Sequence, residues 1–304
     1  VVFYHPGRDL SLAVHGDDFT FCGLEEDLVW IRGLMESWFE IKLRGVLGPD
    51  PGDQKEITIL GRKVVWSEGG ISYEADPKHR ELVLEFFGFC GQSKQSKYNG
   101  LKEDREEVDG DEALPKAEAT EFRGVAARLN YLSLDCPDLQ FPIKECSREM
   151  ANPTRSSWAK AKKVARYLVG RRRVVWEFGW QEEVEEALLL VDSDWGGGKD
   201  RKSTSGGVWS IGGHCIKTWS ASQGPYALSS AEAELYGMVE GATRAKGLRT
   251  LAWELGFRGL TNVIQMGTDS SAAKSFVCRR GLGKMRHLEI RDLWLQEEVE
   301  HGRL

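Results

Sequence analysis

The stretch LLLVDSDWGGGKDRKSTSGGVWSIGG, residues 188–213, decides the fold of the C-terminal part of the chain. It begins with an apolar strand over residues 188–195 that ends in acids. A segment rich in Gly and Lys follows. Two further strands are predicted at 207–211 and 215–220, joined across Gly212-Gly213. Three consecutive strands with short connections indicate an antiparallel run.

A long helix and a fourth strand are predicted after these three strands. The helix extends from about Ser229 to Leu255, and Ser229 with Glu232 fits a capping box at its start. The fourth strand, 263–268, leads directly into Asp269. Further helices are expected at 270–278 and 287–300. This order predicts a mixed α/β layer in which the long helix is a crossover to a parallel strand.

Three carboxylates lie where these elements would bring them together. Asp192 ends the first strand, Glu234 lies in the first turns of the long helix, and Asp269 ends the fourth strand. Strand ends in an α/β sheet face the crevice where ligands bind. Three converging acids repel one another unless cations hold them, and hard oxygen ligands suit Mg²⁺, with Mn²⁺ as a substitute. Two such ions about 4 Å apart activate water and stabilise the leaving oxygen of a phosphodiester.

The pattern favours one of two glutamates on the helix, but it leaves open the choice between two aspartates on the strand. Glu232 and Glu234 point to nearly opposite sides of the helix, and Glu234 continues the packed face while Glu232 fits the capping role. Asp192 and Asp194 share one strand face, so the pattern does not choose between them. Any one of these acids alone is more often a capping or solvated group than a ligand.

The N-terminal part has a different organisation. A β-hairpin is predicted over residues 8–23, with its turn at Gly16-Asp17-Asp18. Residues 91–118 form a polar linker, and residues 103–112 carry a net charge of −6 from seven acids and one Arg. The remaining expected elements are helices at 24–40, 77–89, 119–134 and 157–169, and strands at 56–66 and 71–74.

Composition places the chain among ordinary globular proteins. It has 304 residues, 41% hydrophobic and 29% charged, which favours two domains. No apolar run is long enough to cross a bilayer. Six scattered cysteines without a CxxC pattern argue against zinc and for an intracellular location. The chain begins with Val, so we expect it to start either after processing or at a cut made through a longer reading frame.

The whole chain has a net charge of −6, but it contains one strongly basic segment. Residues 148–173 hold nine Lys and Arg against one acid, a local charge of +8. Part of it is a helix on which Lys160, Lys162, Lys163 and Arg166 could follow a phosphate backbone. The alternative is a solvated helix face, and the two interpretations are about equally supported.

The motifs resemble the ribonuclease H region of copia-type long-terminal-repeat retrotransposons. The resemblance rests on the stretch 188–213 and on ALSSAEAELYG (227–237), MGTDSSAAKSF (266–276) and RHLEIRDLWLQEEV (286–299). It is nearly continuous over 186–301. It implies that Asp192, Glu234 and Asp269 are catalytic metal ligands. It also implies that the Arg201–Gly206 segment, RKSTSG, shapes the turn before the second strand.

The resemblance also indicates what this chain lacks. The family's ribonuclease H has one more strand and a fourth Asp, which we expect to lie beyond Leu304. Glu289 and Asp292 are nearby acids with little claim to replace it.

The N-terminal half resembles the same polyprotein. LAVHGDDFTF (12–21) is similar to the hairpin that presents the paired aspartates of reverse transcriptase, although His15-Gly16 departs from the usual pattern. The resemblance implies that Asp17 and Asp18 belong to a polymerase site whose third Asp lies upstream. Similarity to the thumb entry and connecting region is carried by ITILGRKVVW (57–66), ISYEADPKHRELVLEFFGF (71–89) and FRGVAARLNYLSLDCPDLQFPIKECSREMANPT (122–154).

The predicted fold class is α/β (α+β) in four parts. These are a reverse-transcriptase palm/thumb remnant (1–90), an acidic linker (91–118), a helical connection (119–180), and a ribonuclease H-like mixed sheet with flanking helices (186–304), truncated before its last strand.

The expected function is metal-dependent hydrolysis of the RNA strand of RNA–DNA hybrids. The alternative is a non-catalytic remnant that at most binds nucleic acid. A transposase or integrase is disfavoured by the RKSTSG segment and the polymerase-like hairpin. The expected partners are hybrid or other nucleic acid and the remaining Pol segments, and no membrane.

Overall fold

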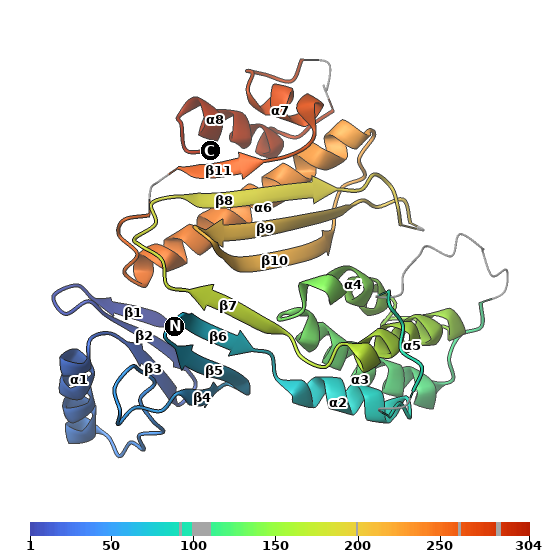
Figure 1. Cartoon of the computed structure of the whole chain (residues 1–304). Coiled ribbons are helices and arrows are strands. Elements are labelled where there is room, and N and C mark those ends of the chain that lie inside the picture. Colours follow the sequence, from blue (N-terminus) through green and yellow to red (C-terminus); the bar gives the residue numbers. More distant parts are fainter. Residues whose placement is uncertain (91–92, 99–110, 199, 261–262, 284–286) are drawn as a thin grey trace. The chain divides into compact units, whose positions relative to one another are not determined.

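The computed structural model describes the chain as two compact units (Figure 1). Unit 1 comprises Val1–Arg44, Gln181–Thr218 and Ser222–Leu304, and unit 2 comprises Gly45–Trp180 and Trp219–Ala221. Among the described residues, no helix is long and apolar enough to span a bilayer. The described residues are 1–90, 93–98, 111–198, 200–260, 263–283 and 287–304.

The N-terminal part of unit 1 is a three-stranded sheet followed by a helix. The strands β1 (Val2–His5), β2 (Leu10–His15) and β3 (Asp18–Cys22) lie in the order β1-β2-β3, and the helix is α1 (Glu25–Trp38). The predicted hairpin is confirmed, with His15 opposite Asp18 and Gly16 at a φ of +62° in the turn. The sequence did not predict β1.

The second sheet of unit 1 has the order β10-β9-β8-β11. β8 (Ala187–Ser193) lies between β9 (Thr204–Ile211), with which it pairs antiparallel, and β11 (Ile264–Gly267), with which it pairs parallel. β10 (His214–Ser222) is the outer neighbour of β9. The predicted run of three strands, crossover helix and parallel strand is confirmed.

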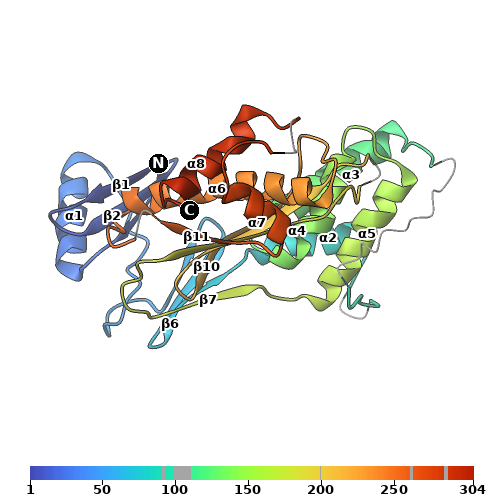
Figure 2. The same cartoon turned by 90° about the horizontal axis from the view of Figure 1, so that it is seen from above.

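The crossover helix α6 (Ser230–Glu254) packs on β8 and β9, and Figures 1 and 2 show it lying along this sheet. Glycines permit the close approach. A Cβ at Gly241 would lie 2.4 Å from Cγ1 of Val191, and one at Gly237 would lie 2.5 Å from Oγ of Ser193. Any larger residue at Gly241 would overpack the buried face of β8.

The remaining helices of unit 1 follow β11. The helix expected at 270–278 is α7 (Ser271–Val277). The single helix expected at 287–300 is wrong in its first half, since only a 3₁₀ turn, Ile290–Leu293, precedes α8 (Trp294–Glu300).

Unit 2 contains a four-stranded sheet with the order β4-β5-β6-β7. The single strand predicted at 56–66 is wrong, because Leu60 and Gly61 both adopt positive φ angles, 49° and 79°, and reverse the chain. The sequence also missed the last strand, which pairs antiparallel with β6. The strands are β4 (Glu56–Ile59), β5 (Arg62–Ser67), β6 (Gly70–Glu74) and β7 (Val175–Gly179).

Four helices form the second part of unit 2 and enclose its core. The expected helices at 77–89, 119–134 and 157–169 are present, and α4 was not predicted. The helices are α2 (Pro77–Phe86), α3 (Lys116–Ser133), α4 (Gln140–Arg148) and α5 (Arg155–Gly170), with a 3₁₀ turn at Pro137–Leu139. Buried side chains from all four helices and this turn form the core, including Val83, Phe122, Leu129, Leu139, Ile143, Val164 and Leu168.

A buried polar network links the sheet of unit 2 to the end of α3. Asp135, 7% exposed, accepts hydrogen bonds from Nε of Arg62 at 3.1 Å and from the hydroxyl of Tyr73 at 2.8 Å. Arg62 also donates to the hydroxyl of Tyr131 at 2.9 Å, and the indole N–H of Trp176 donates to the backbone carbonyl of Asp135 at 3.0 Å. Burial, together with the hydrogen bond to Asp135, raises the pKa of Tyr73.

The compact units group the chain differently from the four predicted segments. Residues 1–44 lie in one unit and 45–90 in the other, and β7 from the expected connection completes a sheet with β4–β6. Half of the predicted acidic linker, 91–92 and 99–110, lies outside the described residues.

Candidate metal centre

The structure brings three of the predicted acids together at one end of β8 and β11. A carboxylate oxygen from each of Asp192, Glu234 and Asp269 lies within 4.8 Å of the other two. Asp192 is the penultimate residue of β8, Glu234 is in the first turns of α6, and Asp269 follows β11 by two residues. Because β8 and β11 are parallel neighbours, their carboxyl ends meet at the same edge.

Local hydrogen bonds show that Asp192, in β8, and Asp194, in the turn after it, have different roles. The carboxylate of Asp194 accepts a hydrogen bond from the backbone N–H of Thr204, and the backbone N–H of Asp194 donates to the Thr204 carbonyl. Asp194 therefore fixes the connection to β9, while Asp192 belongs to the carboxylate group.

The two glutamates of α6 are also distinguished. Glu232 is 1% exposed, and its carboxylate lies 3.1 Å from the backbone nitrogen of Leu228, 2.7 Å from the Tyr236 hydroxyl and 2.9 Å from Nε2 of His287. The capping box is present in part, since Oγ of Ser229 accepts from the N–H of Glu232. Glu232 is thus committed to the helix start, and Glu234 faces the aspartates.

Glu234 is the buried member of the group, and Asp192 and Asp269 are exposed. Oε1 of Glu234 accepts from the N–H of Ser193 at 3.2 Å, and its buried Oε2 has no hydrogen-bond partner among the described residues. Burial raises the pKa of Glu234, and the charges of Asp192 and Asp269 raise it further against the opposing Ser193 N–H. An orphaned carboxylate oxygen beside two further carboxylates fits a hard divalent cation.

This electrostatic strain predicts that Glu234→Gln stabilises the metal-free chain. Above the raised pKa of the folded state, ionised Glu234 lowers the free energy of unfolding. This loss of stability disappears as the pH falls below the pKa of Glu234 in the unfolded chain. At neutral pH in EDTA, we expect Glu234→Gln to raise the melting temperature by about 2–4 °C, or about 1 kcal/mol. The gain should shrink toward acidic pH, where the parent is protonated too.

The matched control for that measurement is Asp194→Ala. It also removes a carboxylate at this edge, but it deletes the acceptor for the Thr204 N–H. We expect a lower melting temperature for Asp194→Ala. If both variants changed the melting temperature equally, the result would contradict the idea that charge repulsion at Glu234 destabilises the metal-free chain.

The sequence did not predict the buried polar side chains near the carboxylates, which bond to Ser193 and to one another. Gln223, 4% exposed, donates to Ser205 Oγ at 2.9 Å, and Ser203 and Ser205 are both buried. Ser203 Oγ accepts from the backbone N–H of Gly196 at 3.0 Å, so the RKSTSG segment shapes the turn before β9 as expected. A Gln directly after a strand gives no sequence signal of burial, because its partners come from three different elements.

The other predicted acids do not join this group. Asp17 and Asp18 lie at the β2–β3 turn, and Asp18 pairs with Arg44 at 3.1 Å. Among the described residues, the only group of three possible ligands contains neither of them. Glu289 and Asp292 are likewise outside it, and burial raises the pKa of Asp292.

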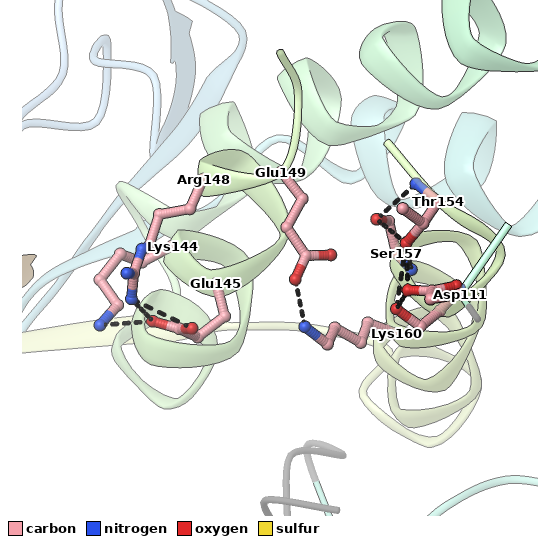
Figure 3. A network of polar contacts seen from close by, with 9 residues as sticks. Asp111, Lys144, Glu145, Arg148, Glu149, Thr154, Ser157 and Lys160 are labelled. Atoms are coloured by element: carbon pink, nitrogen blue, oxygen red, sulfur yellow. Dashed lines mark hydrogen bonds and ion pairs between the residues drawn. The ribbon is translucent and has the colours of Figure 1, made fainter. Parts of the chain in front are cut away.

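The basic segment is less positive than its sequence indicates. Lys160 pairs with Glu149, as Figure 3 shows next to the Asp111–Thr154 contacts that cap α5. Arg166 lies over the ring of Phe89 at 5.9 Å. Four acids from outside the segment offset further cations, in the pairs Arg148–Glu145, Arg155–Glu118, Arg171–Asp138 and Arg173–Glu74. The count of +8 therefore overstates the local field.

The sequence of the chain is similar to those of transposon polyproteins. No family model matches the chain. It is 29% identical over 191 residues to the retrovirus-related Pol polyprotein from transposon RE2 of Arabidopsis thaliana, covering 61% of this chain and 13% of that protein. It is 26% identical over 311 residues to the one from transposon TNT 1-94 of Nicotiana tabacum, covering 96% and 22%.

Among solved structures, the chain is similar to a foamy viral protease-reverse transcriptase dRH in complex with double-stranded DNA. The TM-score is 0.48 at 12% identity, over 96% of this chain and 44% of that one. The chain spans less than a quarter of the length of the two transposon relatives. Both relatives are retrovirus-related Pol polyproteins of plant transposons, and the similarity to the one from TNT 1-94 extends over nearly the whole of this chain.

Proposed function

We propose that this chain is a copia-type Pol segment whose unit 1 hydrolyses the RNA strand of RNA–DNA hybrids with divalent metal ions. The observation that carries the proposal is the meeting of Asp192, Glu234 and Asp269 within 4.8 Å, from two strands and a helix. The ordered motifs of the sequence support the same assignment. Mg²⁺ is the expected ion, with Mn²⁺ as a substitute.

The side chains divide the work of holding the ions and admitting the substrate. Glu234 supplies a buried oxygen that no donor among the described residues satisfies, so it is prepared to bind a cation. Asp192 and Asp269 are exposed, which leaves the outer side of the site open to a phosphate. When bound, a pair of divalent ions would activate water and stabilise the leaving oxygen. The products would be a 3′-hydroxyl and a 5′-phosphate.

The direct test is cleavage of a labelled RNA–DNA hybrid by the purified chain in Mg²⁺ and then in Mn²⁺. RNA-strand products that disappear in EDTA would support the proposal. Intact hybrid in both metals would favour the alternative, a non-catalytic remnant. Substituting the carboxylates one at a time then assigns any cleavage to them.

We also propose that unit 2 binds nucleic acid through α5. Lys162, Lys163 and Arg166 lie on this helix, and Lys160, also on it, pairs with Glu149. Replacing Lys162, Lys163 and Arg166 by Ala should weaken hybrid binding. It should also flatten the logarithmic salt dependence by roughly one unit for each phosphate that the helix no longer neutralises. Fluorescence anisotropy between low and moderate salt measures both quantities.

The control for charge alone replaces three exposed lysines elsewhere in unit 2, namely Lys78, Lys94 and Lys116. Its net-charge change is equal, but its salt slope should stay close to that of the parent. If the α5 variant keeps both the affinity and the slope of the parent, α5 is only a solvated face.

A further inference from the structure

Gln223 occupies a buried position directly after β10 and hydrogen-bonds residues that adjoin the candidate metal centre. Its side-chain Nε2 lies 3.1 Å from Oγ of Ser193, 2.9 Å from Oγ of Ser205 and 2.8 Å from the carbonyl oxygen of Ala233. Its backbone N–H donates to the Ser203 carbonyl at 2.8 Å. One amide group thus connects β8, β9 and the first turn of α6.

Two partners of Gln223 adjoin the carboxylates in sequence. Ser193 follows Asp192, and its backbone N–H lies 2.9 Å from Oδ1 of Asp192 and 3.2 Å from Oε1 of Glu234. Ala233 precedes Glu234 in α6. The hydroxyl of Ser193 faces α6, where a Cβ at Gly237 would lie 2.5 Å from it. Movement of Ser193 would therefore displace both carboxylates.

We propose that Gln223 is a positioning residue that holds Asp192 and Glu234, through Ser193 and Ala233, in the geometry that binds the divalent ion. The inference rests on the proposed function of these carboxylates as ligands. A neutral amide suits the position because it donates two N–H groups to oxygen acceptors without adding charge. A carboxylate there would donate nothing and would repel the existing acids.

The main test compares Gln223→Met and Gln223→Glu with the parent in the full chain. Binding of Mn²⁺ alone, without nucleic acid, is followed by electron paramagnetic resonance. Removing an outer partner of a metal site costs about 10–100-fold in affinity or activity, and we expect an increase of that size in the Mn²⁺ dissociation constant. In hybrid cleavage, kcat should fall by a similar factor while KM changes less than about twofold, because Gln223 is too buried to touch the substrate.

Gln296→Met provides the matched control. Gln296 is also buried in unit 1, at 8% exposure, and donates to the carbonyls of Phe276 at 3.0 Å and Gly281 at 3.2 Å. Its substitution should lower the melting temperature like that of Gln223 but leave Mn²⁺ affinity unchanged. Gln223→Asn keeps the amide with a shorter reach. It should fold even if Gln223→Met does not, and we expect a smaller rise in the Mn²⁺ dissociation constant.

A double-mutant cycle tests whether Gln223 acts on the metal site through the hydroxyl of Ser193. Ser193→Ala should weaken Mn²⁺ binding, and its effect should not add to that of Gln223→Met if both act through the same hydrogen bond. Unchanged Mn²⁺ affinity in folded Gln223 variants would overturn the inference and leave Gln223 as core packing. Failure of the proposed function is a different result, in which Asp192→Asn itself leaves both Mn²⁺ binding and hybrid cleavage unchanged.

Discussion

Replacing Asp192 or Asp269 by Asn is expected to reduce cleavage of the RNA strand of a hybrid by more than about a hundredfold. Changes to the groups that surround a metal's ligands already cost about 10–100-fold, and these two carboxylates would contact the ion themselves. Both are exposed at the edge of the sheet, so the substitutions should leave the fold intact. The measurement is single-turnover cleavage of an end-labelled hybrid in Mg²⁺ and in Mn²⁺.

Two controls make this result specific to the carboxylate group. Asp194→Asn changes a neighbouring acid that fixes the turn to β9, and it should retain most of the activity. Binding of Mg²⁺ should raise the melting temperature of the parent but not of Asp192→Asn, because an ion stabilises only a fold that binds it. Mutants that cleave as well as the parent would show that these acids are not the catalytic centre.

Asp135→Ala should destabilise unit 2 by about 3 kcal/mol. Breaking a buried ion pair leaves an uncompensated charge and costs about 3–5 kcal/mol, and the lower value applies because the side chain of Arg62 keeps 16% exposure. The hydroxyl of Tyr73 loses an acceptor as well. Urea unfolding followed by circular dichroism measures the change, and hydrogen exchange of β5 and β6 locates it.

An exposed ion pair supplies the comparison. Glu36→Ala removes the partner of Arg32 on α1, where both side chains are about half exposed, and should change the free energy of unfolding by less than about 0.5 kcal/mol. If Asp135→Ala costs no more than Glu36→Ala, the network around Asp135 does not link the sheet to α3 in solution.

Local patterns predicted most elements of the fold, and partners distant in sequence account for the failures. The long helix α6 and the β2–β3 hairpin follow from periodicity, capping and turn residues within a short window. β7 is five residues long, and its partner β6 lies far upstream, so nothing near β7 signals the pairing. The turn at Leu60-Gly61 was missed because Leu seldom adopts a positive φ.

The sequence predicted the acids of the candidate site but not the residues that hold them in place. The order of strand end, helix start and strand end identified Asp192, Glu234 and Asp269, whose proximity the structure shows. Neither the choice between Asp192 and Asp194 nor the role of Gln223 follows from spacing, because both depend on hydrogen bonds with other elements. The basic segment was overestimated for a related reason, since its neutralising acids come from elsewhere in the chain.

The parallel pairing of β8 and β11 has a consequence for the order of folding. All of β9, β10 and α6 separates these two strands in the chain, so their pairing carries a large loop-closure cost and should form late. Helix α6 can form on its own within about a microsecond, well before β11 docks. During synthesis, one edge of β8 should therefore remain unpaired until β11 docks, and it could pair with other strands in the meantime. If a divalent ion binds through Asp269, as proposed above, it could bind only after β11 docks, and its binding would favour the fully folded chain.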